Sequence, residues 1–131
     1  MLPTDIKLHR VSGILELTYP DGSYQLKAEL LRVFSPSAEV RGHGPGQEVL
    51  QVGKRHVLIS KIEPVGNYAL RLHFDDDHSS GLYTWDYLRE LCLTQDALWQ
   101  QYLAKLQAAG KSRDPLPKDT QVVTIQPLKS H

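Results

Sequence analysis

The hydrophobic positions of this chain change period several times, and each change predicts a different element. Apolar and polar side chains alternate over residues 15–19, which is the period of a β-strand. The sequence Tyr-Pro-Asp-Gly-Ser at 19–23 supplies a turn, and the alternation resumes over residues 24–26, so the segment predicts a β-hairpin. Residues 28–34 have helical spacing instead, and Pro36 predicts the end of this helix because the residue before a proline avoids the α conformation.

The same pattern recurs in the second half of the chain. Two strands are predicted within residues 56–74, with Pro64 and Gly66 marking the turn between them. An acid-rich turn follows, and residues 82–92 pass from strand into helix, with Thr84 as a suitable N-cap. We therefore predict an α+β fold in which two β-hairpin–helix units form one sheet, with helices packed on it.

The last third of the chain predicts a C-terminal helix and then a tail. Apolar residues at helical spacing favour a separate helix over residues 96–108, ended by Gly110. We expect one domain over residues 1–110. Residues 111–131 are rich in Pro, Lys and Ser and have one short apolar run, so we expect a disordered tail. The alternative is that this apolar run, residues 122–125, docks as an edge strand.

Composition excludes several classes of protein. The 131 residues contain 15 Lys and Arg and 15 Asp and Glu, so the net charge is zero and binding to nucleic acid is not expected. No apolar run approaches the roughly 20 residues that cross a bilayer, so no membrane association is expected. The single cysteine, Cys92, cannot form an internal disulfide, and the chain opens with no charged-then-apolar leader. These features favour a cytoplasmic protein.

The loop Arg-Gly-His-Gly-Pro-Gly at residues 41–46 is open to two interpretations. Its glycines can supply positive φ angles for a wide turn. Alternatively, it is a ligand- or partner-binding loop with Arg41 and His43 at its rim. It is not a phosphate loop. A phosphate loop precedes a helix that begins with Gly-Lys-Ser/Thr, whereas this loop follows a helix and has no such sequence.

Charged residues near this loop have several candidate partners. Arg32 can pair with Glu39 or with Asp76, and Glu39 can instead pair with Arg41 across the loop. His78 follows three consecutive aspartates and is a candidate cation ligand, although Asp and Ser are also ordinary turn residues. No Ser-His-Asp set can be read from the spacing, so no catalytic nucleophile is predicted.

Three motifs in order resemble the family related to the N-terminal domain of gamma-butyrobetaine hydroxylase. They are the hairpin, the segment LRVFSPSAEVRGHGPG, and the segment IEPVGNYALRLHFDDDHSSGLYTWDYL, within residues 7–93. In the hydroxylases this domain precedes a catalytic domain that uses 2-oxoglutarate and iron(II). The iron site of such enzymes needs His-x-Asp or His-x-Glu. The chain has one such triplet, His73-Phe74-Asp75, but it lies within the segment that resembles the N-terminal domain and not in a catalytic domain, so hydroxylase activity is not expected.

The resemblance also implies the position of a former zinc site. The family's C-P-C-x-x-C motif corresponds to Ser35, Pro36, Ser37 and Val40, and its histidine to His78. A serine hydroxyl is a poor zinc ligand near neutral pH. We therefore expect no metal and no cofactor, with His78 the only retained position. The resemblance further implies that the Ser-Pro-Ser loop contacts the turn at residues 75–80.

These observations favour a non-catalytic binding or accessory domain with a protein partner. The family's occurrence beside P-loop iron–sulfur carrier ATPases associates it with iron–sulfur or other metal-cofactor metabolism. One alternative is a small-ligand-binding or enzymatic protein that uses Arg32, Arg41, His43 and His78, and another is a metal site with substituted ligands. The candidate ligand- or partner-binding residues are Arg32, Ser35, Ser37, Glu39, Arg41, His43, Asp76 and His78.

Overall fold

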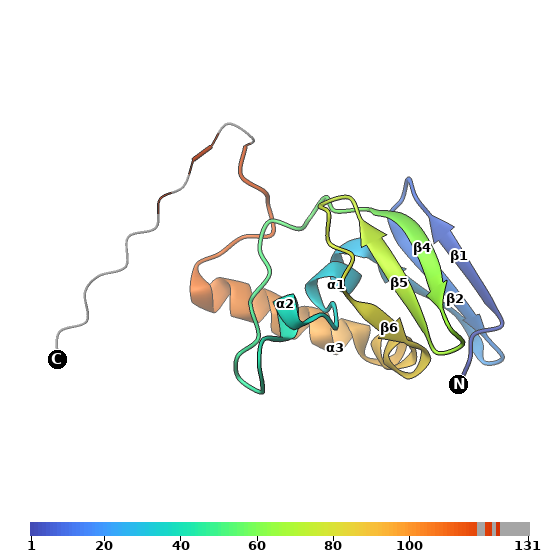
Figure 1. Ribbon diagram of the computed structural model, residues 1–131. Helices are drawn as coiled ribbons and strands as arrows, with labels where there is room; N and C mark the ends of the chain where they lie inside the picture. The colour runs from blue at the N-terminus through green and yellow to red at the C-terminus, as the bar shows by residue number, and fades with distance from the viewer. Residues whose placement is uncertain (118–119, 122, 124–131) are drawn as a thin grey trace.

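The first 27 residues form a three-stranded antiparallel sheet in the computed structural model, which describes residues 1–117, 120, 121 and 123 (Figure 1). Strands β1 (Asp5–His9), β2 (Ile14–Tyr19) and β3 (Gly22–Lys27) lie in that order. The β2–β3 pair confirms the predicted hairpin, with Leu17 opposite Tyr24. Strand β1 was not predicted; it is an edge strand in which alternate residues are only partly buried.

A second three-stranded antiparallel sheet comes from residues 59–84. Its strands are β4 (Ile59–Val65), β5 (Ala69–Phe74) and β6 (Leu82–Thr84), again in chain order. The α+β class is confirmed, and the strands divide between two sheets that touch through β1 and β4. The prediction that Pro64 marks the turn is wrong, because Pro64 lies inside β4, opposite Leu70. β4 is an edge strand, where a missing N–H is tolerated.

Each sheet leads directly into a helix. Helix α1 (Ala28–Val33) follows β3, is buried along its whole length, and is followed by the short α2 (Ala38–Arg41). Helix α3 (Trp85–Ala109) follows β6, and the Thr84 side chain accepts a hydrogen bond from the Tyr87 N–H, as its predicted N-cap role requires. Within the part of the chain that is described, no helix is long and apolar enough to span a bilayer.

The prediction of a separate helix over residues 96–108 is wrong, since α3 runs unbroken for 25 residues. No glycine or proline interrupts it, and the Thr94 hydroxyl donates to the Glu90 carbonyl inside the helix instead of capping a new one. The helix ends, as expected, at Gly110, whose φ is 64°.

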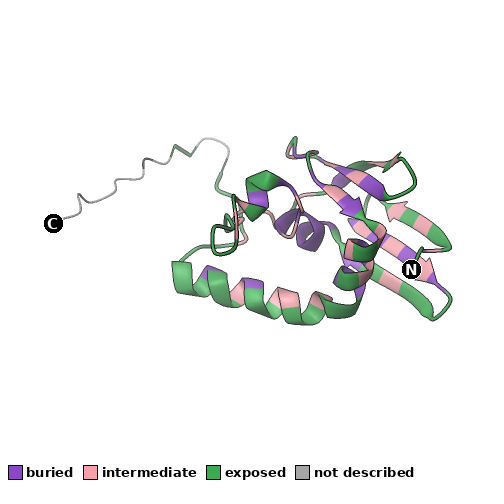
Figure 2. Ribbon diagram, turned by 60° about the horizontal axis from the view of Figure 1, so that its bottom comes forward, coloured by how far each residue is buried: buried purple, intermediate pink, exposed green. Residues whose placement is uncertain are grey.

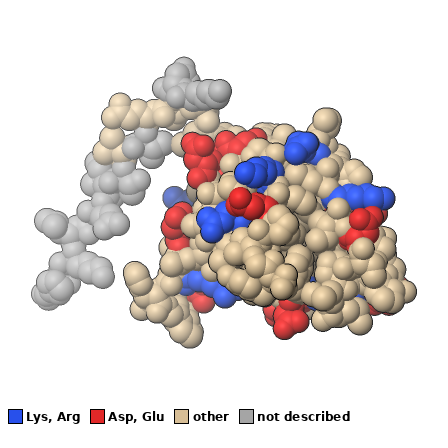
Figure 3. Space-filling model, turned by 45° about the vertical axis from the view of Figure 1, so that its right-hand side comes forward, with Lys and Arg blue, Asp and Glu red and all other residues tan. Residues whose placement is uncertain are grey.

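Both units contribute to one hydrophobic core. α3 packs against β3 and β6, and its buried side chains lie on one face, whereas α1 is buried all round (Figure 2). The main core consists of Leu15, Leu17, Tyr19, Leu26, Ala28, Leu30, Leu31, Ile59, Leu70, Leu72, Phe74, Tyr83, Leu88, Leu91 and Cys92. On the face shown in Figure 3, charges of both signs are interspersed, in keeping with the zero net charge.

The residues just after α3 pack on the domain. The carbonyls of Ser112 and Arg113 accept hydrogen bonds from the backbone N–H groups of Gly53 and Arg55. The Arg113 guanidinium also pairs with the buried carboxylate of Glu29. The segment that we assigned to a tail from residue 111 therefore begins with docked residues. The possible strand at 122–125 lies almost entirely outside the described residues.

Candidate functional site

The Ser-Pro-Ser loop after α1 lies against the turn between β5 and β6, which confirms the expected contact. Ser35 Oγ is 2.8 Å from His78 Nε2, and Ser37 Oγ is 3.4 Å from the same nitrogen. On the other side of the ring, His78 Nδ1 is 3.2 Å from Glu39 Oε2. The second oxygen of Glu39 accepts a hydrogen bond from the Ser80 hydroxyl. Segments about forty residues apart are thus joined through one imidazole.

His78 is held as a neutral ring. Its burial lowers its pKa below the usual range, and the nearby Arg32 charge acts in the same direction, while Glu39 partly opposes them. A carboxylate can only accept a hydrogen bond, so the neutral ring carries its proton on Nδ1, donates it to Glu39, and accepts at Nε2 from Ser35. This network satisfies the polar groups of a buried corner.

Ser35, His78 and Glu39 have the connectivity of a Ser-His-acid triad, which the sequence spacing did not reveal. However, Ser35 is only 1% exposed. Gly81 packs so closely on the serine that an added Cβ would overlap its Oγ. A substrate carbonyl would need that same space. The arrangement therefore supports a structural hydrogen-bond network and not a nucleophile.

The same corner does not fit the zinc ion that the family resemblance implies. Zinc sites need three or four thiolate, imidazole or carboxylate ligands, and here the equivalent positions are Ser35, Ser37 and Val40. The direct hydrogen bond between Ser35 and His78 occupies the space between those donors. Among the described residues, no group of three His, Cys, Asp or Glu side chains is placed to hold a metal ion.

An ion-pair cluster continues from this network. Asp76 Oδ2 accepts hydrogen bonds from Arg32 Nε at 2.8 Å and from Lys54 Nζ at 2.6 Å. Gln51 Oε1 accepts from another nitrogen of Arg32, and Asp76 Oδ1 accepts from the His78 N–H. Burial alone would raise the pKa of Asp76, but the bonds from Lys54 and Arg32 outweigh it and lower that pKa. Of the two candidate partners of Arg32, the structure pairs it with Asp76 and not with Glu39.

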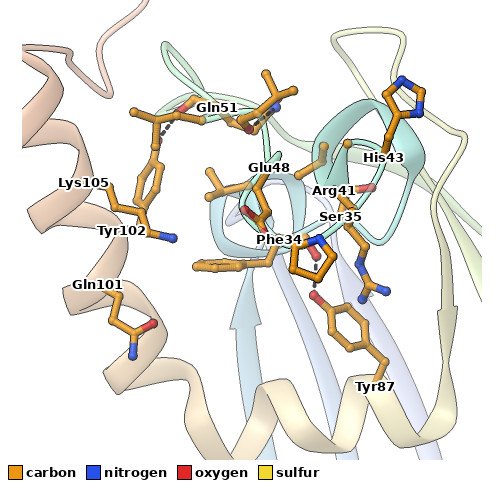
Figure 4. Close-up of a pocket in the computed structure, with 17 residues that line it drawn as sticks. Phe34, Ser35, Arg41, His43, Glu48, Gln51, Tyr87, Gln101, Tyr102 and Lys105 are labelled. Atoms are coloured by element: carbon orange, nitrogen blue, oxygen red, sulfur yellow. Dashed lines mark hydrogen bonds between the residues drawn. The ribbon is translucent and has the colours of Figure 1, made fainter.

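A groove of about 710 Å³ opens beside this cluster, between residues 40–51 and α3 (Figure 4). Phe34 lies between the two walls, and Tyr87, Tyr102 and Lys105 come from the helix. The Tyr87 hydroxyl donates to the Phe34 carbonyl at 2.5 Å, and the Tyr102 hydroxyl donates to the Gln51 carbonyl at 2.7 Å. The Tyr102 bond ties α3 to the opposite wall and the Tyr87 bond ties α3 to Phe34 between the walls, so the groove is formed in advance of any binding.

The glycine-rich loop at residues 41–46 forms part of one wall. It has features both of a wide turn built by glycines and of a binding loop. Gly42 has a φ of 72°, and a Cβ there would overlap the Gln47 carbonyl, so the turn needs glycine. Arg41, just before it, lies with its guanidinium 4.9 Å from the centre of the Tyr87 ring. The His43 ring points away from Phe34 and the helix (Figure 4).

The eight residues predicted as a site separate into two groups. One group is the internal network, which contains Arg32, Ser35, Ser37, Glu39, Asp76 and His78. The other is the groove wall, with Arg41 and His43, and Ser35 borders both. Sequence reasoning missed Lys54, Gln51 and Lys105, which carry no local signal. Tyr102 lies in the segment predicted as a helix over residues 96–108, which gave no reason to assign it to a site.

Comparisons with known proteins agree with the motifs. The family model described as gamma-butyrobetaine hydroxylase-like, N-terminal, matches residues 6–89. A solution structure determined by NMR is 54% identical, with a TM-score of 0.78, over 94% of this chain and 98% of that one. A second NMR structure is 48% identical, with a TM-score of 0.73, over 94% of this chain and 93% of that one.

A crystal structure is also similar. It is of a protein of unknown function in the DUF971 family from Acidithiobacillus ferrooxidans. The identity is 38% and the TM-score 0.56, over 68% of this chain and 90% of that one. Among curated sequences there is no significant match. The chain belongs to the gamma-butyrobetaine hydroxylase-like N-terminal domain family, whose crystal-structure relative has no known function.

Proposed function

We propose that the chain is a non-catalytic accessory domain that binds an extended segment of a partner protein in the groove between residues 40–51 and α3. The groove itself is the observation that carries this proposal. Its volume of about 710 Å³ is typical of a binding site, and its lining combines apolar side chains with a few polar groups. Val49, at its edge, is 53% exposed and available to a partner.

The length of the groove supports a peptide segment over a compact small molecule. α3 lines the groove at two places, at Tyr87 and at the turn that carries Gln101, Tyr102 and Lys105, and Tyr87 and Lys105 are 18 residues apart. At the rise of an α-helix this corresponds to about 27 Å. An extended chain of about eight residues covers that distance at ~3.3 Å per residue.

The alternative of a small ligand or reaction at Arg32, Arg41, His43 and His78 is less well supported. Arg32 and His78 are buried and bonded within the protein. His43 is among the lining residues, but its ring points away from Phe34 and α3 (Figure 4). Only Arg41 of the four borders the groove with its side chain stacked on a groove residue.

The proposal is tested by selection from a library of random nine-residue peptides displayed on phage. The dissociation constant of a selected peptide is then measured by fluorescence anisotropy. Val49→Asn should weaken binding about fivefold, because it removes roughly 1 kcal/mol of apolar burial. The matched control is Val11→Asn, since Val11 is 97% exposed and lies outside the groove lining. Failure to select any peptide, or equal binding by both variants, would overturn the proposal.

We further propose, on family association alone, that the partner belongs to iron–sulfur or other metal-cofactor metabolism. The support is the occurrence of related domains beside P-loop iron–sulfur carrier ATPases. A cytoplasmic setting fits this role, and the single Cys92 favours it because disulfide frameworks are typical of exported proteins. Titration of a purified carrier ATPase with wild-type protein and the Val49→Asn variant tests the association, and equal or absent binding would contradict it.

A further inference from the structure

We infer that Arg41 selects a partner segment in which an acidic residue lies next to apolar residues. This inference rests on the proposed function of the groove and names the chemistry of its occupant. Arg41 is the last residue of α2 and borders the groove at the Tyr87 end. The apolar lining there includes Val40 and Phe34, so an apolar side chain and a carboxylate of one segment can be bound side by side.

The other arginines of the chain show why Arg41 is distinct. All seven lie within the described residues, and five of them form ion pairs. Arg10 donates to the Ser60 carbonyl. Arg41 has no carboxylate within 4.0 Å among the described residues, and its guanidinium is held over the face of Tyr87. Apart from its interaction with Tyr87, its donors therefore face no carboxylate of the described residues and can bind a group from outside.

The position of Arg41 is fixed before binding. Tyr87 is itself anchored through its hydroxyl to the Phe34 carbonyl, so the ring that supports the guanidinium cannot turn away freely. A stacked guanidinium loses little further freedom when it pairs with a carboxylate. Planar, two-pronged hydrogen bonding to a carboxylate is the interaction for which this side chain is best suited.

The charges around the groove also favour an acidic occupant. Its lining contains two permanent cations, Arg41 and Lys105, and one carboxylate, Glu48. The pKa of Glu48 is lowered by backbone hydrogen bonds and by Lys105, so it is ionised at neutral pH. The lining thus has a net charge of +1. Asp86 and Glu90 border Arg41 in a shallow hollow on its other side, beyond ion-pair distance.

The composition of peptides selected on the wild-type protein is the first test. We expect Asp or Glu next to apolar residues to be enriched relative to the starting library. Selection on the Arg41→Gln variant should lose the acidic enrichment and keep the apolar one. The matched control is Arg71→Gln, an arginine on β5 that pairs with Glu63 away from the groove, and it should give the wild-type result.

A double-mutant cycle supplies the second test. Replacing the acidic residue of a selected peptide by Gln should weaken binding to wild type about tenfold, as for a charge-assisted hydrogen bond. With Arg41→Gln the same replacement should have no effect, and thermal melts of both proteins should coincide. Peptides without acidic enrichment, or a tenfold loss that persists in the variant, overturn this inference. In that case the binding of the Val49→Asn and Val11→Asn variants still tests, independently, whether the groove binds a peptide.

Discussion

The ion pair between Glu29 and Arg113 offers a direct measure of how the residues after α3 contribute to stability. Glu29 lies on the buried helix α1 and is 6% exposed. Arg113 Nε donates to Glu29 Oε2 at 2.8 Å, and Arg113 Nη2 donates to Glu29 Oε1 at 2.5 Å. The guanidinium also lies 5.0 Å from the centre of the Trp99 ring. Arg113→Ala removes all of these interactions and leaves the Glu29 carboxylate buried without a partner.

The expected cost can be bounded from the burial of the two side chains. Removing one partner of a fully buried pair costs about 3–5 kcal/mol, because the remaining charge is uncompensated. The Arg113 side chain is 26% exposed, so water can partly replace it and the lower end applies. The lost contact with Trp99 contributes roughly 0.5 kcal/mol of this total. We expect Arg113→Ala to lower the free energy of unfolding by about 3 kcal/mol.

Urea denaturation of the full chain, followed by tryptophan fluorescence and by circular dichroism, measures this difference. Arg55→Ala is the matched control, because its pair with Asp114 is exposed and should contribute about 0.5 kcal/mol or less. The double variant Glu29→Gln/Arg113→Ala should regain part of the loss, since the buried group is then neutral. Equal, small effects of Arg113→Ala and Arg55→Ala would refute the docking of residues 112–115 and support a tail that starts at 111.

Three further predictions follow from the internal network. Asp76→Asn should lower the free energy of unfolding by about 2–3 kcal/mol in urea denaturation, because it weakens the charge-assisted bonds from Arg32 and Lys54; a change below ~0.5 kcal/mol would contradict their assigned role. The pKa of His78 is lower in the folded protein than the usual 6.5, so the unfolded chain binds the proton more readily. Stability should therefore be full above pH 6.5 and decline as the pH falls below it, and His78→Gln should flatten this decline; identical pH profiles would contradict the neutral ring. Thermal melts with and without excess chelator should coincide, since the Ser35–His78 corner lacks a zinc ligand set, and a melt lowered by chelator would disprove this.

The sequence by itself determined the local elements. The β2–β3 hairpin, the short helix before Pro36, the Thr84 cap and the helix end at Gly110 were all predicted correctly. Each depends on side-chain alternation, fixed φ angles or a cap within a few residues, so the information is present in the local sequence. The contact between the Ser-Pro-Ser loop and the β5–β6 turn was also anticipated, but from the family resemblance and not from local pattern.

The tertiary structure decided which distant groups meet. The sequence left Arg32 with two candidate partners, and only packing selects Asp76, which is 44 positions away. The division into two sheets, the docking of Arg113 on Glu29 and the groove along α3 likewise depend on how separate elements pack. Such contacts depend on shape complementarity and on which charges are removed from water. Neither property belongs to a short segment of the chain, so no local pattern could have predicted them.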